Sequence, residues 1–250
     1  MIKTRIIPIL LLKGSSVVKT VQFQEERVVG DAITNVKVFS NRMADEMVIV
    51  DIEATSKKRI NDQLMKRLAA QCVMPLSIGG GVHDIASADT LFKSGADKVV
   101  VNSAFYLDPT LLSVLAQKYG SQSVVFSLDV KESNGEYGCV SNSGCEDQYI
   151  SPVVAAKMAE DYGAGEIILN SVDRDGVMQG YDTELINSVS CAVDLPVIAA
   201  GGCGCEADCV EAINAGASAV AAGSIFYWIG ESIISLKEYM NDNGIEVRFT

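Results

Sequence analysis

Short apolar runs and amphipathic stretches alternate along almost the whole chain. The apolar runs are the length of buried strands, and they are Arg5–Leu12, Met47–Val50, Leu76–Ile78, Lys98–Val101, Val124–Val130, Ile167–Leu169, Val197–Ala200 and Ala219–Ala222. The amphipathic stretches include Ile60–Gln71, Ile85–Ser94, Pro109–Tyr119, Pro152–Tyr162, Thr183–Val193 and Glu206–Ala215. Strands that alternate with helices in this way predict an α/β fold around a parallel sheet.

The number of repeating units narrows the fold class further. Eight strand–helix units in 250 residues match the count and size of a (β/α)8 TIM barrel, and we predict one such domain over residues 1–250. A doubly wound open sheet is the alternative, although it rarely needs eight evenly spaced units. Gly-Ala pairs at Gly95, Gly163 and Gly216 are typical of helix ends.

An internal repeat predicts that the barrel consists of two half-barrels. The stretch that begins PLSIGGG at Pro75 aligns without gaps with the stretch that begins PVIAAGG at Pro196, at an offset of 121 residues. A second match places IIPILLLK, which begins at Ile6, over VVFSLDVK, which begins at Val124. This second alignment sets Leu11 of the first strand opposite Asp129 of the fifth.

Composition excludes several classes of function. Acidic residues outnumber basic ones 32 to 20, which argues against a general nucleic-acid or anionic-membrane binder. The first apolar run is too short for a secretion signal or a membrane span. Seven scattered cysteines therefore indicate reduced thiols in the cytoplasm.

Glycines after the third and seventh strands, and Asn or Ser after the fourth and eighth, favour phosphate binding. Loops without side chains let backbone N–H groups approach an anion, and a helix start favours it. Sites of this kind are common after the last two strands of such barrels. The candidate residues are Gly81, Asn102, Ser103, Gly202, Gly223 and Ser224. The alternative is that these glycines only permit tight turns.

Over nearly its full length the chain resembles the cyclase subunit of imidazole glycerol phosphate synthase. The matching stretches include GGGVHD from Gly79, GADKV from Gly95, GAGEIIL from Gly163, DRDG from Asp173 and GYDTE from Gly180. The resemblance implies a barrel with two phosphate sites, with Asp175 and Gly176 beside the second. It also implies a partner glutaminase, which docks below and supplies ammonia.

The resemblance places one catalytic aspartate of the family on Asp129, whose alternative role is a structural carboxylate at the strand end. The other falls on Leu11, within PILLLKG. Leucine cannot transfer a proton, and loss of a positioned acid or base typically costs about 10²–10⁴-fold in rate. Ordinary cyclase activity is therefore not expected. Lys19 matches a family lysine on the long loop Gly14–Gly30, which differs from the family at most positions.

At the opposite barrel end, the family pattern is complete. Its four charged residues around the ammonia entrance correspond to Arg5, Glu46, Lys98 and Glu166, and their alternative role is a structural salt-bridge cluster. Asp97 resembles a family residue that contacts the glutaminase.

These matches favour an accessory barrel that receives ammonia from a glutaminase and passes it on. Related proteins of this kind accompany bacterial surface-sugar (lipopolysaccharide) enzymes, where a separate ATP-using amidotransferase converts an acetamido group into an acetamidino group. A phosphorylated small ligand would suit the mouth, and no cofactor is expected. A working cyclase that tolerates Leu11 is the alternative. The related sugar-phosphate isomerase is a third reading, which needs no ammonia entrance.

Three other features are explained by local structure without a catalytic or metal-binding role. His83, the single histidine, suits a loop or cap position. Cys203, Cys205 and Cys209 lack a histidine or a second cysteine pair nearby, so we expect no metal site. Residues 132–148 form a Gly-, Ser- and Asn-rich insertion that predicts a hairpin on the active face.

Overall fold

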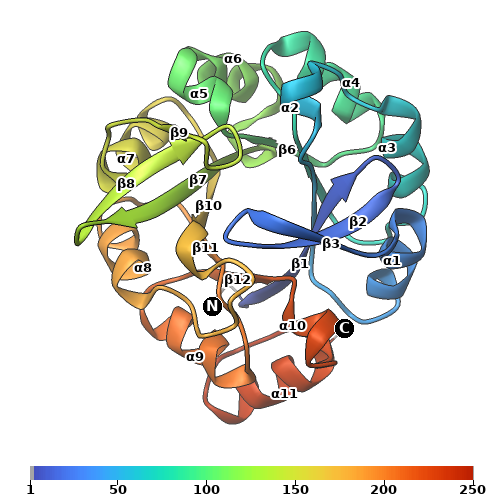
Figure 1. Cartoon of the computed structure of the whole chain (residues 1–250), viewed down its shortest axis with the longest axis vertical. Coiled ribbons are helices and arrows are strands. Elements are labelled where there is room, and N and C mark those ends of the chain that lie inside the picture. Colours follow the sequence, from blue (N-terminus) through green and yellow to red (C-terminus); the bar gives the residue numbers. More distant parts are fainter. Residues whose placement is uncertain (1–2, 250) are drawn as a thin grey trace.

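Eight parallel strands close into a barrel in the computed structural model, which describes residues 3–249 (Figure 1). They are β1 (Arg5–Lys13), β4 (Met47–Asp51), β5 (Leu76–Gly79), β6 (Lys98–Val101), β7 (Val124–Ser133), β10 (Glu166–Ser171), β11 (Val197–Ala200) and β12 (Ala219–Ala222). Strand β1 pairs with both β4 and β12, and β7 pairs with β10, so the barrel has no open edge. The predicted TIM barrel is confirmed, and the open doubly wound sheet is excluded.

Helices surround the barrel (Figure 1). They are α1 (Ala32–Ser40), α2 (Ala54–Lys57), α3 (Asp62–Ala69), α4 (Ile85–Lys93), α5 (Ser103–Leu107), α6 (Thr110–Tyr119), α7 (Pro152–Asp161), α8 (Thr183–Ser190), α9 (Glu206–Asn214), α10 (Ile225–Trp228) and α11 (Ile233–Asp242), with 3-10 turns at Ser121–Ser123 and Val172–Arg174. Every helix predicted from the sequence is present. Gly95, Gly163 and Gly216 take positive φ angles just past helices, as predicted.

Two antiparallel hairpins extend the strands at the upper end of the barrel. The insertion after β7 forms β8 (Glu136–Ser141) and the short β9 (Glu146–Asp147), which confirms the predicted hairpin. The segment after β1, described above as a loop, instead forms β2 (Ser16–Val21) and β3 (Gln24–Asp31). Its turn residues Gln22 and Phe23 both have positive φ, the geometry that suits a two-residue hairpin turn.

The apolar core has two layers. The larger layer lies between the barrel and its helices. The smaller fills the barrel interior and consists of Ile7, Val48, Val100, Val125, Ile168, Ile198, Ala200, Ala219 and Ala221, with Ile9 and Val50 packed against them. Because strand side chains alternate between the two faces, the barrel strands other than β5 contribute apolar side chains to both layers.

Candidate functional site

A cavity of about 1340 Å³ opens at the carboxyl ends of the barrel strands. Loops from both half-barrels line it, so the closed fold brings together residues that are up to about two hundred positions apart. The sequence-predicted residues that line it are Leu11, Lys19, Gly81, Asn102, Ser103, Asp129, Asp175, Gly176, Gly202, Gly223 and Ser224. The mouth is therefore the candidate binding site of the chain.

Asp129 is the buried carboxylate of this mouth. Asn102 Nδ2 donates to Asp129 Oδ2 at 3.0 Å and also to the carbonyl oxygen of Ser127 at 2.9 Å. Burial raises the pKa of Asp129 to about 7, although hydrogen bonds from Ser127, Asn170 and Asn102 oppose the rise. A carboxyl group with a pKa near neutrality can both give and accept a proton under physiological conditions.

Leu11 contributes hydrocarbon to the same mouth. It lies in register with Val50 on β4 and with Val18 on β2. Ile9 and Val50 also line the cavity, so this wall is aliphatic. The mouth therefore contains the buried carboxyl of Asp129 without a carboxyl group at the end of β1.

Two glycines bring the backbone of the second half-barrel close to the cavity. Gly202 has φ +115°, and a Cβ atom there would lie 2.1 Å from the carbonyl oxygen of Gly180. A Cβ atom on Gly223 would lie 2.0 Å from Lys19 Nζ. A side chain at position 202 would clash with backbone, and one at position 223 would displace the Lys19 amine, so glycine keeps the backbone close to the cavity at both positions, as anion-binding loops require.

Lys19 reaches from the β2–β3 hairpin into the mouth beside Gly223. Its Nζ donates to the carbonyl oxygen of Ile9 at 2.8 Å and lies 5.4 Å from the ring centre of Tyr227. Burial lowers the pKa of Lys19 to about 8, although the charge of Asp175 opposes this shift. The amine is thus a cation at neutral pH that is poorly solvated and available to an anionic ligand.

The β2–β3 hairpin lies across the barrel opening (Figure 1). Its far end is tied to the loop after β10: Thr20 Oγ1 donates to Asp175 Oδ2 at 3.0 Å, and the Gln22 N–H donates to the Asp175 carbonyl oxygen at 2.8 Å. Gln22 Nε2 also donates to the carbonyl oxygen of Asp173. These contacts span both half-barrels, so the hairpin forms a strap over the mouth.

The candidate residues of the first half-barrel already make internal contacts. The Gly81 N–H donates to Thr55 Oγ1 at 3.3 Å. Ser103 Oγ donates to Asn102 Oδ1 and accepts from the N–H of Asn142, both at 3.1 Å. His83 is exposed, and its Nδ1 lies 2.7 Å from the carbonyl oxygen of Gly81. A phosphate here would have to displace some of these contacts.

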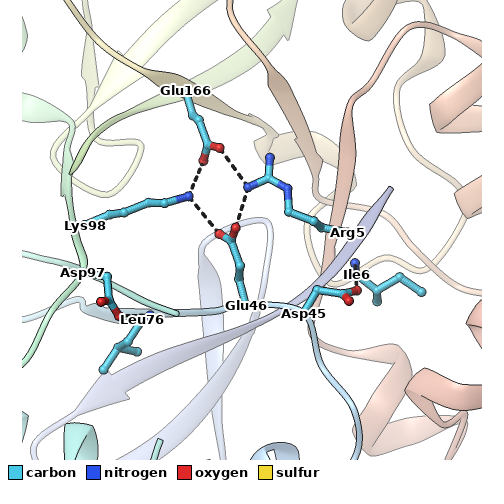
Figure 2. Close-up of polar contacts among 8 residues, drawn as sticks. All are labelled: Arg5, Ile6, Asp45, Glu46, Leu76, Asp97, Lys98 and Glu166. Carbon is cyan, nitrogen blue, oxygen red and sulfur yellow. Dashed lines mark hydrogen bonds and ion pairs between the residues drawn. The ribbon is translucent and has the colours of Figure 1, made fainter. Parts of the chain in front are cut away.

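At the opposite end of the barrel, four charged side chains form a closed ring (Figure 2). Arg5 Nη1 lies 2.7 Å from Glu46 Oε1 and 2.8 Å from Glu166 Oε1. Lys98 Nζ lies 3.0 Å from Glu46 Oε2 and 2.9 Å from Glu166 Oε2. Each cation thus contacts both carboxylates. Burial lowers the pKa of Arg5, but the charges of Glu166 and Glu46 and their hydrogen bonds with it have the larger combined effect, so the pKa of Arg5 lies above its usual value.

Known proteins are similar in sequence to this chain over nearly its whole length. A profile of the histidine biosynthesis protein family matches residues 5–229. The imidazole glycerol phosphate synthase subunit HisF of Pyrobaculum aerophilum is 43% identical, over 98% of both chains. HisF of Chlorobaculum parvum is 40% identical, over 99% of this chain and all of the relative. A putative subunit hisF2 of Pseudomonas aeruginosa is 39% identical, with the same coverage.

The chain belongs to the HisF family of histidine biosynthesis proteins. The resemblance inferred from short motifs is thereby confirmed at the level of the family. Its barrel fold and its relationship to the synthase subunits are established by these matches. The finer assignment, to a sugar-modifying complex, is a proposal that we develop below. None of the helices described is long and apolar enough to cross a membrane.

Several site residues of this HisF-family chain were not found from the sequence. Asp51 is the last residue of β4 and Asn170 the last but one of β10, and both line the mouth. Burial raises the pKa of Asp51. The Asn170 Oδ1 atom is buried and has no partner among the residues described. A polar residue at the carboxyl end of a barrel strand is the signal that could have identified both.

Asp97 has an internal contact that the sequence did not reveal. Its Oδ2 accepts the N–H of Leu76 at 2.8 Å (Figure 2). The predicted role of Asp97 at a partner interface remains a prediction, and the contact to Leu76 uses one acceptor site of its carboxylate. The thiols of Cys203 and Cys209 lie 3.7 Å apart, and residues 3–249 contain no group of three or more His, Cys, Asp or Glu side chains arranged to hold a metal.

Proposed function

We propose that this HisF-family chain is the ammonia-conducting subunit of a glutamine-dependent complex in the cytoplasm. A glutaminase docks at the lower barrel face, and ammonia passes through the barrel. A separate ATP-using amidotransferase then uses it to convert an acetamido group on a surface sugar into an acetamidino group. The observation that carries this proposal is the contrast between the complete charged ring at the base and Leu11 at the mouth.

The barrel interior supports transfer of a neutral molecule. Between the ring and Asp129, the interior core consists of aliphatic side chains such as Val48, Val100 and Ile168. Ammonium would lose its hydration there without a compensating partner, whereas neutral ammonia would lose far less. The ring and the aliphatic interior together favour passage of ammonia over ammonium.

A working cyclase is the second candidate, and Asp129 is the observation that favours it. Its pKa near 7, the candidate phosphate loops and the strap with Lys19 would all suit acid–base chemistry on a phosphorylated substrate. Against this candidate, no carboxylate ends β1. A single acid–base group would have to do the work of two.

The decisive experiment measures cyclisation with ammonium as the nitrogen source. Purified protein is supplied with ammonium salts and the ribulosyl phosphate intermediate of histidine biosynthesis. We expect a rate below about one hundredth of that of an ordinary HisF, from the loss of one acid–base group. A rate equal to that of an ordinary HisF would reject the accessory-subunit proposal and establish the cyclase alternative.

A further inference from the structure

The residues that directly precede the ring residues in the chain differ between the two half-barrels. In the first half, Asp45 precedes Glu46 and Asp97 precedes Lys98. The Asp45 N–H donates to the Ile6 carbonyl oxygen at 3.2 Å, and Asp45 Oδ2 accepts the Ile6 N–H at 2.8 Å. Asp45 therefore holds Ile6 by two bonds, directly beside the contact between Arg5 and Glu46 (Figure 2).

Asp97 makes the same two-bond clamp between β6 and β5. Its N–H donates to the Leu76 carbonyl oxygen at 2.8 Å, and its Oδ2 accepts the Leu76 N–H at 2.8 Å (Figure 2). The preceding residue, Pro75, accepts the Met47 N–H at 3.0 Å, and Met47 follows Glu46. A continuous set of backbone contacts thus joins the strand of Lys98 to the strand of Glu46.

The second half-barrel makes the backbone bond without the carboxylate. At the positions equivalent to Asp45 and Asp97, the N–H groups of Gly165 and Ser218 donate to the carbonyl oxygens of Val124 at 2.9 Å and Val197 at 2.8 Å. A Cβ atom on Gly165 would lie 2.1 Å from the Ser121 carbonyl oxygen, so no side chain fits there. Barrel closure therefore does not require these carboxylates, and their presence in the first half needs another explanation.

Lys237 of the last helix, α11, holds Asp45 in place. Its Nζ lies 2.9 Å from Asp45 Oδ1 and donates to the Met43 carbonyl oxygen at 2.7 Å. The Lys237 side chain is 2% exposed and that of Asp45 6% exposed. A pair buried this deeply costs desolvation energy that hydrophobic replacements would avoid. Its geometric result is that both Asp45 oxygens are fixed, one on Lys237 and one on Ile6.

We propose that Asp45 and Asp97 are positioning residues for the charged ring, with Lys237 fixing Asp45. Asp45 sets Arg5 against Glu46, and Asp97 sets Lys98 against Glu46. Glu166 follows Gly165, which has no carboxylate to make such a clamp, and the side-chain contacts described for Glu166 are those to its two ring partners. The ring residues of the first half-barrel are thus fixed by the clamps beside them, whereas the side chain of Glu166 depends on its contacts with Arg5 and Lys98. The consequence for ammonia transfer rests on the function proposed above.

Crystal structures of variants test the geometry without any assay of function. Asp45→Ala alone would leave Lys237 buried and unpaired, so the double variant Asp45→Ala/Lys237→Met is used. We expect the contact between Arg5 and Glu46 to open beyond about 4 Å, the usual limit for an ion pair. The contact between Lys98 and Glu166 should persist.

Two variants of Asp97 separate loss of the clamp from loss of the charge, because only one of them keeps an acceptor for the Leu76 N–H. Asp97→Ala should separate Lys98 from Glu46 and leave the contact between Arg5 and Glu166. Asp97→Asn retains an oxygen acceptor for the Leu76 N–H and should leave all four ring contacts intact. Glu211→Gln, which removes an exposed carboxylate from α9, is the control and should also leave the ring unchanged. An intact ring in both alanine variants, or loss of all four contacts in each, would overturn the proposal.

A second measurement links the ring to transfer. In the reconstituted complex, the ratio of glutamine-driven to ammonium-driven amidination should fall about tenfold in both alanine variants, by analogy with the lower end of the effects seen when residues that orient metal-binding side chains are removed. Asp97→Asn should keep more of this ratio than Asp97→Ala. If the wild-type complex shows no glutamine-driven amidination, the proposed function is rejected, and the crystal structures still decide the positioning roles. An unchanged ratio in variants with a broken ring would overturn the link to transfer.

Discussion

At the scale of single residues, the buried carboxyl group of Asp129 should make the stability of the folded protein depend on pH. Its folded pKa of about 7 lies above the usual value of 3.8, because burial disfavours the charged form. The folded protein therefore binds this proton more tightly than the unfolded chain does. The contribution of this group to the free energy of unfolding is fully present below about pH 4 and is lost as the pH rises through about 7.

Replacement of Asp129 by asparagine should remove that pH dependence. Asparagine Oδ1 can still accept from Asn102, so the variant should unfold less readily than the wild type at pH 8, by roughly 2–4 kcal/mol. The difference should shrink toward zero as the pH falls to about 4. Denaturant unfolding at a series of pH values measures it. Asp194→Asn, at an exposed carboxylate, is the control, and a difference that is the same at pH 4 and pH 8 would contradict the assignment.

Leu11→Asp tests whether one side chain separates this chain from a cyclase. The new carboxylate would supply a proton-transfer group, which is worth about 10²–10⁴-fold in rate when it is well positioned. We expect cyclisation to rise above that of Leu11→Asn, which cannot transfer a proton, yet to stay well below an ordinary HisF because the β2–β3 strap also differs. Steady-state rates with ammonium measure both variants. A full cyclase rate in Leu11→Asp would show that Leu11 alone blocks the reaction.

At the scale of elements, the strap formed by β2 and β3 depends on a small number of contacts at its far end. Thr20→Val removes the hydrogen bond to Asp175, which is worth about 1 kcal/mol. Local opening should then be about fivefold more frequent, and tryptic cleavage at the exposed Arg27 should accelerate to match. Thr183→Val, at an exposed threonine outside the strap, is the control. Equal cleavage rates in wild type and Thr20→Val would mean that other contacts hold the strap.

At the scale of the whole molecule, the lower face should seal against the glutaminase, since ammonia released into water would be protonated and lost. Asp97→Lys places a positive charge where a negative one is expected to meet the partner. Glutamine-driven amidination should fall sharply, while amidination driven by added ammonium should survive because it bypasses the docked glutaminase. Asp97→Asn separates charge from geometry, since it keeps an acceptor for Leu76.

The outcomes of this last experiment are distinct. Equal loss of both activities in Asp97→Lys would indicate damage to the barrel through the Leu76 contact. No loss of either would leave the charged ring with a structural role only, and the proposal of a conduit would lose its main support.

The sequence alone determined the barrel and its two-fold repeat, because these depend on periodic apolar patterns. The members of the ring followed from the resemblance to the family, whose four charged positions are all matched in this chain. It also predicted the hairpin after β7, whose turn contains Asn134-Gly135, a sequence that favours positive φ angles. The hairpin after β1 escaped prediction because Gln22 and Phe23 adopt those angles without any such signal. Their conformation is imposed by contacts across the mouth with the loop after β10.

The tertiary structure alone decided which groups meet. Asp45 and Lys237 are separated by 192 positions, and nothing in an amphipathic helix distinguishes a lysine that is buried from one that is solvated. The pKa of Asp129 likewise depends on burial, which only the assembled mouth defines. Local patterns specify strands and helices because they act over a few residues. Long-range pairing depends on where the closed barrel places the chain, and that is why the clamps beside the ring are visible only in the folded structure.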